Sequence, residues 1–338
     1  MRRMARVAWL AALLLVATHS VAQSGLYIPE PASSGHQLIF VYDARDGRTT
    51  FLTVSATILP APASVSRSAA SALPGQSATI EIAFYPLSLA ARLGDRVVAI
   101  GDGETIVIDP RAPEYAAFAA GQAGLVVVTP IVSESDRHPI ALNGALLGSF
   151  TIANTNLGAG FGGTAAARDA VDRGGAIAPG GAIVDGSDVR YQRIAPRSLT
   201  LNGFFNPATL GRPEDDGNRV LIAAFDDVYG TRFDVQPQRV LLFPTFSAPR
   251  GAPLAGSPVC TDGIVFTSLQ ALAAPSTLDA AGYAGFRIQG PMVGNLFGFF
   301  AESLGTYGAG QRLTSNAATV PRWMTRFRIR VNMRHSSR

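Results

Sequence analysis

The chain has no lysine and a single cysteine, Cys260, in 338 residues. One cysteine excludes an intrachain disulfide, so the stability of the fold has to come from its apolar core. No histidine lies near Cys260 in the sequence, and we interpret it as a buried, inert thiol rather than a nucleophile. All 28 basic residues are arginine, which indicates a GC-rich coding bias rather than a function.

Histidine is scarce, and the motifs of nucleophilic hydrolases are absent. Only His36, His138 and His335 lie beyond residue 22, which argues against a multi-histidine metal site. The sequence has no G-x-S-x-G, H-E-x-x-H or S-x-x-K motif. Residues 133–138 contain Ser, Glu, Asp and His, but neighbours on one loop rarely reach the geometry of a catalytic triad. A polar surface turn explains that segment, and the absences favour a protein that is not an enzyme.

Tryptophan is almost absent, since Trp323 is the only one beyond residue 22. Sugar-binding surfaces usually present exposed Trp or Tyr rings, in which this chain is poor. Most of its aromatic residues are Phe, and we interpret the groups at 204–205 and 297–300 as core.

Positive charge is concentrated at the two ends of the chain, although the formal net charge is +4. Residues 23–321 hold 19 Arg against 24 acidic residues, whereas residues 322–338 hold six Arg and no acid. The high pI therefore comes from the ends, and nucleic acid is not expected as a partner of the body.

The basic tail at 322–338 alternates strictly between arginine and apolar residues over much of its length. In an extended strand Arg326, Arg328, Arg330 and Arg334 would share one face. We favour an edge strand protected by charge, or a frayed tail. The alternative is a patch for an anionic surface such as lipopolysaccharide, an acidic glycan or nucleic acid.

The N-terminus has the three parts of a secretory signal peptide in order. Arg2, Arg3 and Arg6 precede an 11-residue apolar run at 7–17, and small residues precede a cleavage site after Ala22. The run is shorter than the about 20 residues that a membrane-spanning helix needs. Residues 1–22 are therefore predicted to be removed. We expect an exported protein of the periplasm, the cell surface or the extracellular space, with no transmembrane helix after cleavage.

Short runs rich in Val, Ile, Phe and Thr, separated by Gly, Asp and Pro, predict a mainly β protein. We expect two β-sandwich domains of the immunoglobulin-like, Greek-key kind, with short helices in the connections. Candidate helices are at 86–93, 113–120 and 164–173. The predicted order is a signal peptide at 1–22, a β-sandwich at 23–155, a Gly/Ala-rich connection at 156–190, a second β-rich domain at 191–321, and the basic tail at 322–338.

Residues 158–163, GAGFGG, match the G-x-G-x-x-G pattern of dinucleotide-binding loops, and Asp185 lies where a ribose-binding acid would be expected. However, no alternation of strands and helices follows the glycines. We therefore favour a flexible interdomain connection, and no nucleotide cofactor is expected.

Two acidic clusters are weak candidates for a metal site, and Ca²⁺ is the ion that such loops would hold in an exported β protein. They contain Asp215 and Asp216, and Asp226 and Asp227. An extended strand of seven residues between them would separate the clusters by roughly 20 Å. They could not share one ion, and solvated turns are the favoured interpretation of both.

Several short pieces resemble a loosely defined group of uncharacterised exported proteins of environmental bacteria. These pieces are 25–29 (GLYIP), 46–54 (DGRTTFLTV), 152–158 (IANTNLG), 191–202 and 218–222 (NRVLI). The resemblance implies paired β-sandwich modules without an assigned activity, and supplies no catalytic residue. We expect an exported envelope or cell-surface protein of structural or binding type, whose partner would be an envelope component, a glycan or another protein. An exported hydrolase with an unrecognised site is the alternative.

Overall fold

The structure is a computed structural model, and it is mainly antiparallel β-sheet with one short helix among the residues described. The predicted fold class is confirmed at this level. No helix of the described part is long and apolar enough to cross a membrane. The structure describes residues 27–28, 32–57, 77–87, 92–131, 133–135, 144–155, 159–172, 175–176, 190–194, 199–205, 219–228, 234–237, 239–248, 259–262, 264–268, 283–289, 295–304 and 307–312.

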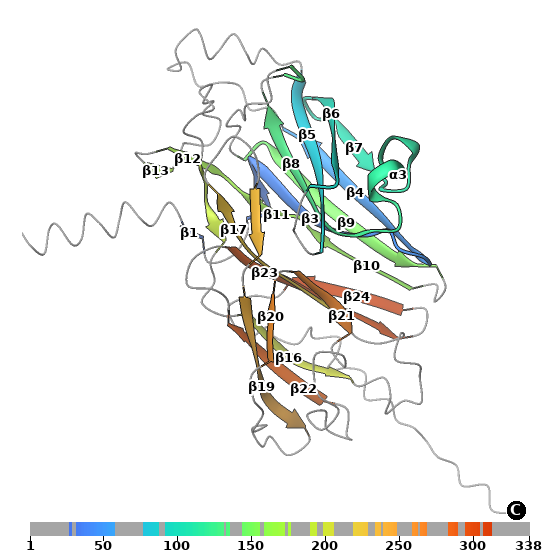
Figure 1. Cartoon of the computed structure of the whole chain (residues 1–338), viewed down its shortest axis with the longest axis vertical. Helices are drawn as coiled ribbons and strands as arrows, with labels where there is room; N and C mark the ends of the chain where they lie inside the picture. Colours follow the sequence, from blue (N-terminus) through green and yellow to red (C-terminus); the bar gives the residue numbers. More distant parts are fainter. Residues whose placement is uncertain are drawn as a thin grey trace, which may run out of the picture.

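Two five-stranded sheets make up the first half of the chain (Figure 1). The β4–β9 sheet has the order β10-β9-β4-β7, with the short β2 also on β9, and the β3–β8 sheet has the order β11-β3-β8-β5-β6. The strands are β2 Ser34–Gly35, β3 Gln37–Asp43, β4 Arg48–Ala56, β5 Ser77–Pro86, β6 Gly94–Gly101, β7 Thr105–Ile108, β8 Ala123–Ile131, β9 Leu146–Asn154, β10 Ala159–Thr164 and β11 Ala166–Arg168.

The two sheets pack face to face around one apolar core. Phe40 and Leu38 of β3 lie so close to β9 that a Cβ added at Gly148 would be 2.5 Å from the Phe40 ring. Leu52, Val54, Phe150 and Ile152 of the β4–β9 sheet complete the core from the other side. This is a β-sandwich, in which glycine at position 148 makes room for an aromatic ring.

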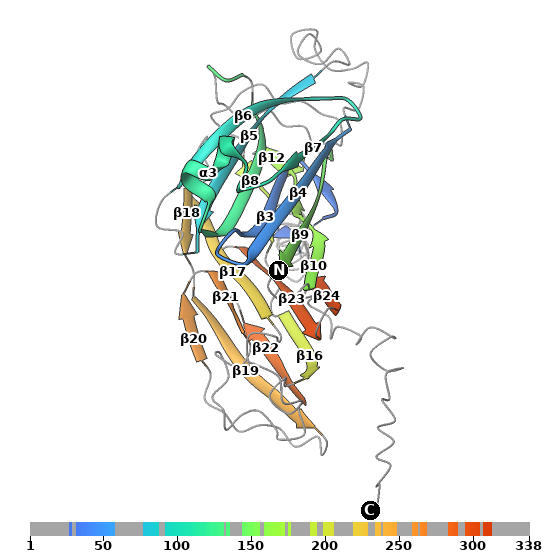
Figure 2. The same ribbon diagram turned by 90° about the vertical axis from the view of Figure 1, so that its right-hand side faces the viewer.

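Helix α3, Pro113–Ala119, connects β7 of one sheet to β8 of the other, and confirms the helix predicted at 113–120. Pro113 occupies the first helical turn, where its missing N–H costs no hydrogen bond. Tyr115 and Phe118 pack against Phe84 at ring-centroid distances of 5.5 and 5.4 Å. Figure 2 shows the helix beside β5 and β6 at the margin of the sandwich.

The second half of the chain forms two further antiparallel sheets, of order β16-β22-β19-β20 and β18-β17-β23-β24, with β21 also on β17. Both views show the first of these at the end of the molecule farthest from β5 and β6, and β24 beside β10 (Figures 1 and 2). The strands are β16 Leu199–Phe205, β17 Arg219–Val228, β18 Asp234–Pro237, β19 Arg239–Ala248, β20 Val259–Asp262, β21 Ile264–Ser268, β22 Tyr283–Gln289, β23 Asn295–Leu304 and β24 Tyr307–Arg312.

Short strands accompany the sheets. β1 Tyr27–Ile28 pairs in parallel with β15 Arg193–Ile194. β12 Ala170–Asp172 pairs with both β13 Gly175–Ala176 and β14 Arg190–Tyr191. The β1–β15 pair thus joins segments from both sides of the predicted connection, whereas β12 and β13 lie within it.

Two local predictions are wrong. Residues 164–173 do not form a helix, because 159–164, 166–168 and 170–172 are strands. Gly160, Gly162 and Gly163 of the G-x-G-x-x-G pattern lie in β10, antiparallel to β9, and not in the flexible connection that we favoured, while Gly158 lies outside the described residues. Part of the predicted connection therefore belongs to the two sheets of the sandwich. At 86–93, residue 86 ends β5, residues 87, 92 and 93 are not helical, and 88–91 lie outside the described residues.

Candidate functional site

The outer face of the β4–β9 sheet is built from alternate residues of its two central strands. Inward residues such as Leu52 and Ile152 enter the core, so the residues between them point outward. The register places four outward pairs side by side: Thr49 with Ala153, Phe51 with Thr151, Thr53 with Ser149, and Ser55 with Leu147. These pairs form rows that run across the sheet.

The flanking strands lengthen the rows. On β10, Gly160 pairs with Ala153, Gly162 with Thr151 and Thr164 with Ser149. On β7, Val107 pairs with Thr53 and Thr105 with Ser55. We call this surface the hydroxyl face; its members are Thr49, Phe51, Thr53, Ser55, Thr105, Val107, Leu147, Ser149, Thr151, Ala153, Gly160, Gly162 and Thr164.

Hydrogen bonds between side chains of neighbouring strands order part of the hydroxyl face. The Thr53 and Ser149 hydroxyls contact each other, and the Thr53 hydroxyl also donates to the Ser149 carbonyl at 3.3 Å. The Ser55 and Thr105 hydroxyls are 2.7 Å apart. Cross-strand hydroxyl pairs of this kind fix side-chain rotamers and stabilise a sheet modestly.

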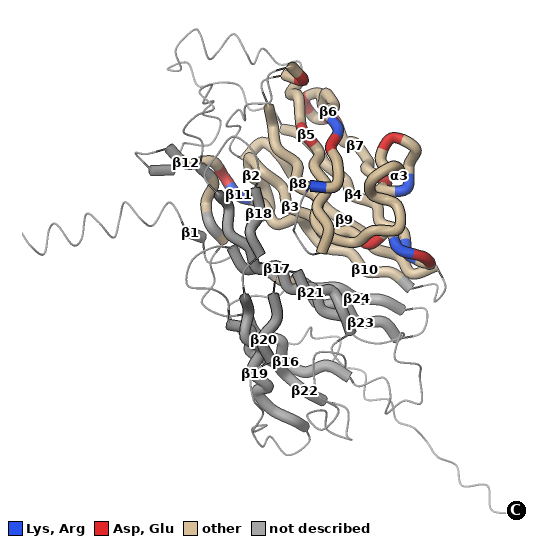
Figure 3. The backbone as a smooth tube through the Cα atoms, viewed as in Figure 1, with Lys and Arg blue, Asp and Glu red and all other residues tan. Residues whose placement is uncertain are grey.

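The hydroxyl face also carries three large apolar side chains that are exposed to solvent. Phe51 is 43% exposed, Leu147 42% and Val107 62%. None of the residues of the face is charged, and Figure 3 shows the middle of β4 and β9 free of charge colour. Charge begins only at its margin, where the Arg111 guanidinium donates to the Thr49 hydroxyl at 3.2 Å.

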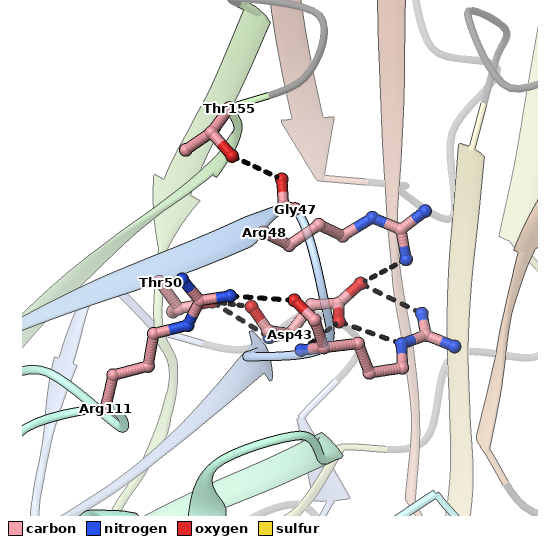
Figure 4. Close-up of polar contacts among 7 residues, drawn as sticks. Asp43, Gly47, Arg48, Thr50, Arg111 and Thr155 are labelled. Carbon is pink, nitrogen blue, oxygen red and sulfur yellow. Dashed lines mark hydrogen bonds and ion pairs between the residues drawn. The ribbon is translucent and has the colours of Figure 1, made fainter.

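A buried carboxylate stabilises that margin, at the turn between β3 and β4 (Figure 4). Asp43 is fully buried and accepts hydrogen bonds from the Arg45 guanidinium at 2.9 Å and from Arg48 at 2.8 Å. The Thr50 hydroxyl donates to the Asp43 carbonyl at 2.8 Å and accepts from its N–H at 2.9 Å. Arg111 donates to the carbonyl of Arg45 at 2.9 Å.

The electrostatics at Asp43 suit a structural ion pair. Burial acts to raise the pKa of Asp43, but the hydrogen bond from Arg45 and the charges of Arg48 and Arg45 outweigh it and hold the pKa below its usual value. The same hydrogen bond raises the pKa of Arg45. Asp43 therefore stays ionised and bonded to Arg45 and Arg48, and these ion pairs stabilise the turn that precedes β4.

A second polar cluster lies inside the first half of the chain, where β2 passes into β3 and β10 into β11. Arg168 is fully buried, and its guanidinium donates to the Gln37 side-chain oxygen at 2.7 Å. Gln37 in turn donates to the Thr129 hydroxyl at 2.8 Å. Arg168 also lies 4.8 Å from the centroid of the Tyr191 ring, within the range of a cation–π contact.

His36 and Asp169 complete this cluster. The His36 ring stacks on Tyr191 at a centroid distance of 5.4 Å, and burial, with the nearby Arg168 charge, lowers the pKa of His36 to about 3. Oδ1 of Asp169 accepts the backbone N–H groups of His36 at 3.1 Å and Gly144 at 2.9 Å. Burial raises the pKa of Asp169 against the opposing effect of these bonds. A neutral, buried imidazole at physiological pH suits a packing role better than proton exchange with a substrate.

Of the sequence-predicted site residues, the structure describes only Asp226 and Asp227. Asp226 and Asp227 lie within β17, paired with Gln236 and Val235 of β18, so the turn interpretation of this cluster is wrong. Asp215, Asp216, the leader at 1–22 and the tail with Arg326, Arg328, Arg330 and Arg334 lie outside the described residues. Within the described part, no group of three His, Cys, Asp or Glu side chains is placed to hold a metal ion.

The other chemistry-bearing residues are also dispersed. Cys260 lies in β20, opposite Leu241 of β19. In the triad-like segment the Ser133 and Ser135 hydroxyls are 3.1 Å apart, while His138 lies outside the described residues. Sequence reasoning missed the hydroxyl face, because its rows combine strands far apart in the chain. The available signal was the T-x-F-x-T alternation at 49–53.

Comparisons with known proteins add no functional information. No protein-family model matches the chain, and no curated protein matches it. Among solved structures, the viral chemokine binding protein R17 encoded by rodent gammaherpesvirus Peru aligns over 86% of this chain and 88% of its own. The identity is 8% and the TM-score 0.19, so this similarity carries no argument about fold or function.

Proposed function

We propose that the chain is an exported protein of the bacterial cell envelope or surface that acts by binding, through the hydroxyl face, and not by catalysis. The observation that carries this proposal is an exposed, ordered and uncharged sheet face that displays Phe51, Val107 and Leu147 among hydroxyl groups. Exposed apolar side chains gathered on one face mark a contact surface more often than scattered ones do.

Two buried titratable groups, Asp43 and His36, support this choice because their contacts suit structural roles. Asp43 is clamped by two arginines, and His36 is buried and stacked on Tyr191. Export is supported by the order of basic, apolar and small residues at 1–22.

The first test is cell fractionation of a tagged full-length chain, combined with protease treatment of intact cells. We expect loss of residues 1–22 and recovery of the mature protein with the envelope or on the cell surface. Recovery of the uncleaved chain in the cytoplasm would overturn the export part of the proposal.

The second test asks whether the hydroxyl face retains the protein on the envelope. The triple variant Phe51→Ser, Val107→Ser, Leu147→Ser should shift most of the mature protein into the soluble fraction without loss of β-structure in circular dichroism. Val97→Ser is the matched control, because Val97 is a half-buried apolar residue on β6 of the other sheet. Equal retention of the wild type and the triple variant would show that this face is not the binding surface.

A further inference from the structure

We infer that the hydroxyl face binds an uncharged polysaccharide, a conclusion that rests on the proposed function and names its ligand class. Three observations support it: the rows carry no charge, their hydroxyl groups both donate and accept, and the exposed ring of Phe51 lies among them.

The lack of charge on the hydroxyl face distinguishes between anionic and uncharged polymers as its ligand. Proteins that bind nucleic acid, lipopolysaccharide or acidic glycans neutralise the ligand charges with Arg or Lys. The hydroxyl face has neither, and Arg111 at its margin is already bonded to Thr49 and to the Arg45 carbonyl. The neighbouring Arg45 and Arg48 are both held by the carboxylate of Asp43, which offsets one of their two positive charges. A polyanion would therefore lose its hydration on this face without gaining an ion pair.

The hydroxyl groups match the chemistry of a sugar. Each Thr or Ser hydroxyl can donate one hydrogen bond and accept two, as sugar hydroxyls do. The face presents the hydroxyls of Thr49, Thr53, Ser55, Thr105, Ser149, Thr151 and Thr164 in rows across the sheet. Neighbours within a row are one strand spacing apart, about 4.8 Å, and successive rows are two residues apart, about 6.8 Å. Rows of this spacing can follow the repeating units of an extended polymer better than they can follow a single small molecule.

Phe51 supplies an apolar surface for the C–H face of a sugar ring. It pairs with Thr151 on β9, and Thr151 pairs with Gly162 on β10. A Cβ at Gly162 would lie 3.2 Å from the Thr151 hydroxyl and 2.7 Å from the Phe150 carbonyl oxygen, so no side chain fits there. Because Gly162 has no side chain, nothing at this position rises beside the Phe51–Thr151 row on its β10 side. Phenylalanine takes the place of the tryptophan that sugar-binding surfaces more often use.

The size of the face argues against a second copy of the chain or another protein. Six residue steps along β4 and three strand spacings across the sheet give about 20 Å by 14 Å, or about 300 Å². A stable protein–protein interface buries about 800 Å² on each partner. The hydroxyl face is thus too small for a protein partner, whereas it is large enough for a few sugar units.

The test is depletion of the purified mature chain by insoluble cellulose, starch and mannan, with alginate beads as the anionic comparator. We expect binding to at least one neutral polymer and none to alginate, with affinity unchanged between about 50 mM and 1 M salt. Phe51→Ser should weaken binding about tenfold or more, Phe51→Tyr should retain it, and Val97→Ser should leave it unchanged.

The outcomes separate the ligand class from the proposed function. Binding to none of the three neutral polymers, or salt-sensitive binding to alginate, overturns the inference. If the triple variant still leaves the envelope fraction in that case, the binding face stands and its ligand is not a neutral glycan. Dimerisation of the wild type that Phe51→Ser abolishes, measured by analytical ultracentrifugation, would assign the face to a second copy instead.

Discussion

The two sheets of the first sandwich have different outer faces, although they share one core. In the β3–β8 sheet every residue of β3 and β8 is buried, including the outward Ile39, Val41 and Val127. In the β4–β9 sheet only alternate residues are buried, and the outer face is exposed. Strands β3 and β8 are therefore covered on both sides, and β4 and β9 on one side only.

This difference in burial is reflected in the residue patterns of the strands. A strand buried on both faces becomes a nearly continuous apolar run, as in QLIFVYD and AGLVVVTPI. A strand with one solvent-exposed face alternates between buried and exposed residues, as in RTTFLTVSA. The outward Thr and Ser residues of β4 and β9 thus mark the solvent-exposed side of the sandwich.

The largest expected effect compares adjacent residues of β4. Leu52 is fully buried and Phe51 is 43% exposed. Leu52→Ala should lower the free energy of unfolding by about 2–5 kcal/mol, because it leaves a cavity in the core. Phe51→Ala should lower it by no more than about 1 kcal/mol. Urea denaturation followed by far-UV circular dichroism measures both, and equal losses would refute the one-sided burial of β4.

A pair of glycines gives the next largest contrast. A Cβ at Gly124 of β8 would overlap the backbone carbonyl oxygen of Tyr85 on β5, whereas a Cβ at Gly160 of β10 would lie 3.3 Å from the Ile152 carbonyl oxygen. Gly124→Ala should therefore destabilise the protein by about 1–3 kcal/mol and Gly160→Ala by less than about 1 kcal/mol. Midpoints of thermal unfolding measure the difference, and a reversed order would contradict the closer packing of β8.

A third test concerns His36, where the chain passes from β2 of one sheet to β3 of the other. Arg168, Tyr191 and Asp169 surround it, and its pKa is lowered from 6.5 to about 3. The unfolded chain binds a proton below pH 6.5 that the folded His36 does not. Stability is therefore complete above pH 6.5 and falls as the pH is lowered toward 3, by up to about 1.4 kcal/mol per pH unit.

Denaturation of wild type and His36→Phe at several pH values measures this contribution. The variant keeps a ring against Tyr191 and should lack the slope between pH 6.5 and 5. Below that window Asp43, whose pKa is lowered, also loses stabilisation on protonation, whereas Asp169, whose pKa is raised, works in the opposite direction. Parallel curves for the two proteins would show that His36 titrates normally in the fold.

The smallest expected effect is on the hydroxyl face itself. Thr151→Val removes an exposed hydroxyl and should change the free energy of unfolding by less than about 0.5 kcal/mol. The matched change Thr50→Val removes a buried hydroxyl that bonds the backbone of Asp43, and should cost about 1 kcal/mol or more. Chemical denaturation of both variants tests the contrast, and a large loss at Thr151 would assign that hydroxyl a structural role.

Local patterns in the sequence predicted the β class, the helix at 113–120 and breaks at Gly, Asp and Pro between the strands. The turns at Asp46-Gly47 and Asp102-Gly103 follow from glycine, because Gly47 and Gly103 both adopt φ of 73°. The sequence pattern failed at 164–173, where a run of alanines has high helix propensity. Pairing of Ala166 and Ala167 with Ile39 and Leu38 overrides that propensity.

The candidate site was harder to predict, because it depends on pairing between distant strands. The alternation at 49–53 indicated a half-buried strand, but not that Thr151 would lie beside Phe51 or Val107 beside Thr53. The buried Arg168 is likewise invisible locally, since its partners Gln37 and Tyr191 lie far from it in the chain. Register is a tertiary property, so neither the rows nor the polar cluster follow from local composition.

The passage from β10 into β11 sets the order in which the sandwich can be completed. β10 closes the edge of β9, and β11 closes the edge of β3, which was made more than a hundred residues earlier. A chain that folds from its N-terminus therefore holds β3 and β9 with one open edge each until β10 and β11 arrive. Such long-range closure is slow and exposes unpaired strands to other chains. The edge strand β10 is thus the last strand added to its sheet, and until then β9 can pair with a strand of another chain.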